Sequence, residues 1–121
     1  MNPDRLTAIE KLTAPGEDYE MVPGEVWGRP CREFINAPAT LRDWFESTRS
    51  DATFLVYADE RYSFEETALR VGKIGTILST QYGVGKGDRV AISMRNYPEW
   101  VMAFNAVTSI GAVAVAMNSL W

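Results

Sequence analysis

The sequence predicts an α/β fold in which a helix and a β-hairpin precede a parallel, right-handed βαβ unit. Two mainly apolar runs, residues 90–94 and residues 112–117, indicate buried strands. About a dozen residues of helical character lie between them, as a crossover between parallel strands requires. Such crossovers are right-handed in nearly all sheets. A chain of 121 residues is long enough for one domain at most.

Residues 1–39 form a leader rich in proline and glycine. Residues 1–12 are compatible with a short helix or with a frayed terminus. The density of chain-breaking residues excludes long regular elements in the remainder, so we expect an irregular segment. Aromatic and apolar residues are interspersed among its acidic ones, which suggests a strap laid over a larger body. The chain breakers are Pro15, Gly16, Pro23, Gly24, Gly28, Pro30 and Pro38.

Residues 40–64 predict a helix followed by a hairpin. Thr40 is a candidate N-cap with Asp43 three residues later, and the helix is expected over residues 40–48 with Leu41, Trp44 and Phe45 on one face. Residues 54–57 and 62–64 predict two strands joined by a turn.

A longer helix is expected from Ser63 to about Tyr82. Ser63 and Glu66 have the spacing of a capping box, and Gly83 suits a left-handed stop. Gly72 and Gly75 each cost about 1 kcal/mol relative to alanine. Their presence predicts close approach of another backbone. The expected apolar face comprises Phe64, Ala68, Val71, Gly75, Leu78 and Tyr82.

The glycine-rich run at residues 83–87 superficially resembles a phosphate-binding loop. Such loops follow a strand and precede a helix, whereas this run follows a helix and precedes a strand. The order therefore predicts a turn.

Asn96 is the expected N-cap of the next helix, with Pro98 in its first turn and Glu99 reaching back to the cap. Its body is apolar nearly all round, so we expect it to be covered on more than one side.

Composition argues against several classes of function. A net charge of −4 without a basic run argues against a nucleic-acid partner. The absence of histidine removes Ser-His-Asp and Cys-His catalysis and most zinc sites. The single cysteine excludes an internal disulfide and, with no signal-peptide pattern at the N-terminus, predicts a cytoplasmic protein.

Two groups of charged residues are candidates for a site. Asp59, Glu60 and Arg61 could form a carboxylate site, but a solvated hairpin turn explains them better. Asp88 and Arg89 could pair before the strand, which is a structural role in most proteins.

Arg95 and Asn96 follow a parallel strand, at the edge where α/β sheets place ligands. Capping remains the better account of Asn96. Asn105 could face a pocket, although a hydrogen bond to neighbouring backbone is favoured. Cys31 has no histidine partner for nucleophilic chemistry. No residue is therefore predicted to be catalytic, cofactor-binding or metal-binding.

Four segments together resemble the N-terminal part of the AMP-forming adenylating enzymes, which include acyl-CoA synthetases, peptide-synthetase adenylation domains and luciferases. They are residues 62–66, 83–92 and 96–100, and residues 111–115 with Asn118. The resemblance implies that residues 40–121 are a truncated AMP-binding domain of an acyl-CoA synthetase, of the fatty-acid type. Such a parent forms acyl-CoA, AMP and pyrophosphate from an acid, ATP and CoA through an acyl-adenylate, with Mg²⁺ neutralising phosphate charge.

The resemblance also implies what this chain lacks. The family's phosphate loop ending in lysine, its adenine-contacting motif, ribose-binding aspartate and C-terminal catalytic lysine all belong downstream of the matched region. ATP, Mg²⁺ and CoA are thus expected for the parent and not for this chain, whose role would be structural. The expected partners are the remainder of the polypeptide and, by self-association, further copies; the parent could associate with membranes. Met117 stands where the family often has proline.

Two alternatives remain open from the sequence. One is a stand-alone α/β interaction module. The other is a C-terminally anchored membrane protein, because residues 100–121 carry no charge and are long enough to span a bilayer. Polar residues and Gly111 interrupt that stretch, which favours a helix followed by a strand.

Overall fold

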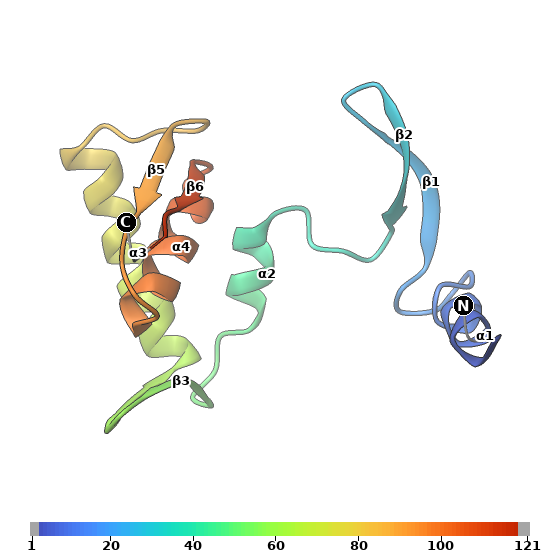
Figure 1. Cartoon of the computed structure of the whole chain (residues 1–121), viewed down its shortest axis with the longest axis horizontal. Coiled ribbons are helices and arrows are strands. Elements are labelled where there is room, and N and C mark those ends of the chain that lie inside the picture. Colours follow the sequence, from blue (N-terminus) through green and yellow to red (C-terminus); the bar gives the residue numbers. More distant parts are fainter. Residues whose placement is uncertain (1–2, 119–121) are drawn as a thin grey trace. The chain divides into compact units, whose positions relative to one another are not determined.

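The computed structural model describes residues 3–118. Contacts divide the chain into two compact units, residues 1–38 and residues 39–121. Figure 1 shows the elements of both units in chain order.

The first unit contains a helix, which is one of the two alternatives expected for residues 1–12, and an antiparallel hairpin, so the expectation of an irregular segment is wrong for the residues of the hairpin. Its elements are α1 (Pro3–Leu12), β1 (Met21–Val26) and β2 (Arg29–Phe34). Val26 pairs with Arg29 around a two-residue turn. Pro23 and Pro30 are tolerated in these strands because, within the described residues, each strand pairs on one side only, and proline need not donate to a ladder on its free edge.

The second unit begins with two capped helices and a hairpin, as the sequence predicts. The Thr40 hydroxyl accepts a hydrogen bond from the Asp43 amide at 3.1 Å. Ser63 and Glu66 form a complete capping box, with each side chain accepting from the other residue's amide. The elements are α2 (Leu41–Ser47), β3 (Thr53–Tyr57), β4 (Glu60–Ser63) and α3 (Phe64–Gln81).

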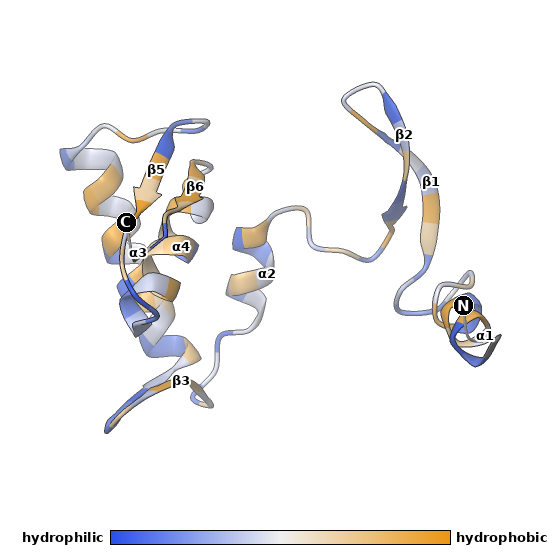
Figure 2. Cartoon of the chain, in the orientation of Figure 1, coloured by the Kyte–Doolittle hydropathy of each residue, from blue (hydrophilic) through white to orange (hydrophobic). Residues whose placement is uncertain are grey.

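A parallel β-α-β arrangement follows, which confirms the predicted fold class. It consists of β5 (Arg89–Ile92), α4 (Pro98–Ser109) and β6 (Val113–Ala116). The two strands pair in parallel from Arg89 opposite Val113 to Ile92 opposite Ala116. Figure 2 shows mostly hydrophobic residues along β6 and along the later part of β5.

The predicted cap of α4 is wrong. Tyr97, not Asn96, is the N-cap residue, and it makes no side-chain hydrogen bond. Pro98 occupies the first turn and has no amide hydrogen, so one fewer donor needs a partner there. The Trp100 amide bonds the Tyr97 carbonyl oxygen at 3.0 Å.

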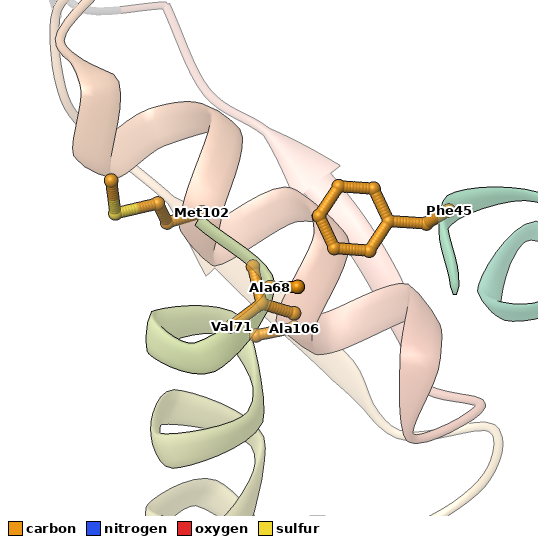
Figure 3. Close-up of a cluster of buried hydrophobic side chains, with 5 residues drawn as sticks. All are labelled: Phe45, Ala68, Val71, Met102 and Ala106. Atoms are coloured by element: carbon orange, nitrogen blue, oxygen red, sulfur yellow. The ribbon is translucent and has the colours of Figure 1, made fainter. Parts of the chain in front are cut away.

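The core of the second unit lies where α2, α3 and α4 meet. Five buried side chains converge there, as Figure 3 shows: Phe45, Ala68, Val71, Met102 and Ala106. Helix α4 contacts α2 and α3 and also both strands of the parallel pair, which confirms that it is covered on more than one side. Leu41 and Trp44 were expected to share the inward face of α2 with Phe45, but both are exposed.

In the described part of the chain, no helix is long and apolar enough to cross a membrane. The uncharged stretch that starts at Trp100 is the body of α4, a turn and then β6. The alternative of a single membrane-spanning helix over residues 100–121 is therefore wrong for the part that the structure describes, which ends at residue 118.

Candidate functional site

A shallow hollow lies beside the loop that follows β5, at the carboxyl-end edge of the strand, where α/β sheets often place ligands. The start of α4 and strand β3 form its walls, and its volume is about 210 Å³. The lining residues are Leu55, Val56, Tyr57, Asn96, Tyr97, Pro98, Trp100 and Val101.

Aromatic contacts organise the hollow. The rings of Tyr57 and Tyr97 meet edge to face, with centroids 5.4 Å apart and planes at 87°. Trp100 stacks on Phe104 at 5.5 Å along the same helix face. Such pairs stabilise by about 1 kcal/mol beyond the area they bury. The walls are thus held by ring packing between β3 and α4.

The chemistry that this lining offers is mainly apolar contact, with a few side chains that can form hydrogen bonds. The lining residues include an amide and two phenols but no carboxylate, amine or thiol. The hollow can accept an apolar or flat group whose polar atom reaches Asn96.

The structure separates the two residues predicted at this edge. Both residues are exposed, but only Asn96 of the two lines the hollow. The backbone oxygen of Arg95 accepts a hydrogen bond from the Tyr97 amide at 2.8 Å. Sequence reasoning missed the contribution of β3, because no local pattern signals which strand packs beside the start of α4.

The charged hairpin turn is structural, as predicted. Arg61 Nη1 donates to the backbone oxygens of Ala58 and Glu60, both at 2.8 Å. The Tyr62 hydroxyl donates to Glu60 Oε2 at 2.6 Å, and this hydrogen bond to an ionised acceptor raises the pKa of Tyr62. The Glu60 carboxylate therefore forms a hydrogen bond within its own strand, β4.

Three other candidates also have structural partners. Asp88 Oδ2 accepts from the Gly85 amide at 2.9 Å and shapes the turn between α3 and β5, so the glycine-rich run is the predicted turn. Asn105 Nδ2 donates to the Val101 backbone oxygen at 2.9 Å, which confirms the favoured interpretation. Partial burial, together with the neighbouring Glu33 carboxylate, raises the pKa of the Cys31 thiol, so less of the nucleophilic thiolate forms.

Comparison with known proteins agrees with the resemblance read from the sequence. A family model described as AMP-binding enzyme matches residues 41–121. The chain belongs to the AMP-binding enzyme family. Fatty acyl-CoA synthetase A of Dictyostelium discoideum is 33% identical over an alignment of 131 positions. The alignment covers 93% of this chain and 19% of that protein.

Other members of the AMP-binding family differ in the acid that their names specify. The 3-hydroxybenzoate/4-hydroxybenzoate–CoA ligase of Thauera aromatica is 38% identical over 68 residues, covering 56% of this chain and 13% of that enzyme. Among solved structures, the N-terminal subdomain of Klebsiella oxytoca NpsA in complex with anthranilyl-AMSN has a TM-score of 0.63 and 28% identity. That match covers 66% of this chain and 21% of the N-terminal subdomain chain. The chain thus spans about a fifth or less of the length of these relatives.

Within the AMP-binding segment, an ion-pair cluster that the sequence did not reveal joins α2 to α3. Arg49 Nε donates to Glu65 Oε2 at 2.8 Å, and Arg49 Nη2 donates to Glu65 Oε1. Arg49 Nη1 also pairs with Glu46 Oε2 at 3.0 Å. The bidentate hydrogen bond from Arg49 lowers the pKa of Glu65, and the same bond raises the pKa of Arg49 above its already high ordinary value.

This cluster predicts a specific acid sensitivity. Glu65 has a lower pKa in the folded chain than in the unfolded one, where it is about 4.3. Its contribution is therefore complete above that unfolded value and is lost as pH falls through the folded pKa. We expect Glu65→Gln to reduce the fall in thermal unfolding midpoint between about pH 5 and about pH 3.

The matched control is Asp59→Asn, which removes an exposed carboxylate outside the ion pairs described. Thermal unfolding followed by circular dichroism at a series of pH values makes the comparison. An acid slope that is the same in Glu65→Gln and in the wild-type chain would contradict the assignment.

Proposed function

We propose that this chain is the N-terminal part of an ATP-dependent, AMP-forming acyl-CoA ligase. The parent would convert a carboxylic acid, ATP and CoA into acyl-CoA, AMP and pyrophosphate through an acyl-adenylate, with Mg²⁺ neutralising phosphate charge. The match of residues 41–121 to the AMP-binding family supports this proposal, as do the CoA-ligase names of the relatives.

A fatty acid is the substrate class that we favour for the parent. The match to the Dictyostelium fatty acyl-CoA synthetase A covers 93% of the chain, so it includes most of the leader. The match to the hydroxybenzoate ligase covers only 56%. Assaying the intact ligase for AMP release with a long-chain fatty acid and with 4-hydroxybenzoate tests this choice, and a preference for the aromatic acid would contradict it.

Within such a ligase we assign residues 39–118 a scaffolding role, and the observation that carries it is the parallel strand pair. Parallel sheets normally have helices on both faces and more than two strands. Among the described residues, β5 and β6 pair only with each other, and Val113 remains 47% exposed. Further strands of the ligase would continue this sheet. The lining of the hollow beside β5 is mainly apolar and carries no charged side chain, which supports a structural role.

Titrating Mg-ATP into the 121-residue chain in a calorimeter tests the scaffolding role directly. We expect no binding at micromolar ATP, because no residue of the hollow offers a cation to the phosphates. Micromolar affinity would contradict the proposal.

A chimera gives the complementary test. This chain replaces the matching N-terminal segment of the Dictyostelium synthetase, and acyl-CoA formation is measured with a fatty acid, ATP and CoA. A scaffold of the same kind should support activity. A folded chimera that binds ATP but forms no acyl-CoA would count against an equivalent role.

A further inference from the structure

The tip of the β1–β2 hairpin combines an exposed aromatic residue with an unfavourable backbone conformation. Trp27 and Gly28 form the two-residue turn, with φ angles of 55° and 76°. The side chain of Trp27 is 98% exposed, and that of its neighbour Val26 is 51% exposed. Figure 1 shows this tight turn at one end of the hairpin.

Tryptophan is a costly choice for this turn. Two successive positive φ angles define the turn type in which Asn-Gly is preferred, because a bulky side chain on an L residue crowds the backbone there. The indole makes none of the described ring contacts that could offset this cost. An outlier of this kind at a protruding tip indicates a role outside the unit's own packing.

The shape of the tip favours a lipid surface over a protein as its occupant. Stable protein interfaces bury more than about 1,000 Å² with close complementarity, whereas the tip presents two apolar side chains on a narrow turn. Tryptophan is enriched at membrane–water interfaces, where its ring lies among apolar groups and its N–H meets water. The other large apolar residues exposed on the hairpin, Phe34 and Ile35, lie at its opposite end, where Phe34 pairs with Met21, so they do not extend the tip into a larger apolar face.

We propose that Trp27 and Val26 insert into the interfacial region of a bilayer with zwitterionic headgroups. Residues 13–38 carry five acidic and two basic side chains, so anionic lipids should repel this part of the chain. Insertion of one small apolar tip gives weak, reversible binding, well below that of a spanning helix. The proposal is independent of the ligase function, because vesicle binding requires no activity.

Co-sedimentation of the 121-residue chain with phosphatidylcholine vesicles tests the proposal. We expect Trp27→Asn to lower the partition coefficient roughly tenfold, since burial of a large apolar side chain is lost. Asparagine is a favoured residue at this turn position, so this variant should keep the hairpin folded. Circular dichroism of both chains checks that the fold is retained.

Trp44→Gln is the matched control, because Trp44 is also exposed but lies on helix α2. Its partition coefficient should equal that of the wild-type chain. Equal losses in the two variants, full binding by Trp27→Asn, or no binding by the wild-type chain would each overturn the proposal. Stronger binding to phosphatidylglycerol vesicles than to phosphatidylcholine would overturn it as well.

Discussion

Replacing Phe45 with alanine should lower the free energy of unfolding of the second unit by about 3 kcal/mol. Phe45 is 4% exposed, and its ring reaches from α2 into the cluster formed by α3 and α4 (Figure 3). It also contacts the ring of Phe54, with centroids 6.3 Å apart. Alanine would leave a cavity bounded by three helices and a strand, which cannot all move inward to fill it.

Urea denaturation followed by circular dichroism measures this loss. Trp44→Ala is the control in the same helix, since Trp44 is 56% exposed and its removal should cost less than about 1 kcal/mol. Phe45→Leu should lie between the wild-type chain and Phe45→Ala, and it keeps the change measurable if the alanine variant unfolds. Equal effects at positions 44 and 45 would show that α2 does not pack as described.

The features predicted correctly from the sequence are those that depend on near neighbours in the chain. The caps at Thr40 and Ser63 each involve a hydroxyl and an amide three residues apart. Gly83 ends α3 because its φ of 67° is open to glycine at little cost. The parallel strand pair follows from two apolar runs and the length of the helix between them. Local chemistry specifies each of these features.

The features that the sequence did not reveal depend on contacts between distant segments. Arg49 and Glu65 are sixteen residues apart, so no helical spacing relates them. Three apolar residues of α2 were candidates for burial, and the sequence could not show that only Phe45 is buried, because that depends on where α4 lies. For the same reason, the hollow beside Asn96 could be placed at an edge of the sheet, but its wall from β3 could not be foreseen.

The leader shows a different limit. Counting proline and glycine predicted an irregular segment, because such counts do not distinguish a residue that breaks a strand from one that occupies its free edge or its turn. Gly28 lies in the turn itself, and Trp27 precedes it where asparagine would be expected. An unusual residue at the turn therefore concealed the hairpin.

Two glycines three residues apart on α3 should respond to substitution with opposite signs. The sequence predicted close backbone approach at both, and the structure confirms this at Gly75 only. A Cβ atom at Gly75 would lie 3.3 Å from Ile110 Cγ2 and 3.8 Å from the Ala106 backbone oxygen, whereas one at Gly72 would meet nothing within 4 Å. The expectation for Gly72 is therefore wrong.

Gly72→Ala should raise the free energy of unfolding by about 1 kcal/mol, because alanine favours the helix and restricts the unfolded chain. Gly75→Leu should lower it by about 1–3 kcal/mol, since the larger side chain forces α3 away from α4. Gly72→Leu is the matched control for side-chain size, and it should not destabilise the chain, because the site is open. Urea denaturation of the three variants measures the contrast. Destabilisation of similar size by leucine at both positions would mean that the α3–α4 contact does not run through Gly75.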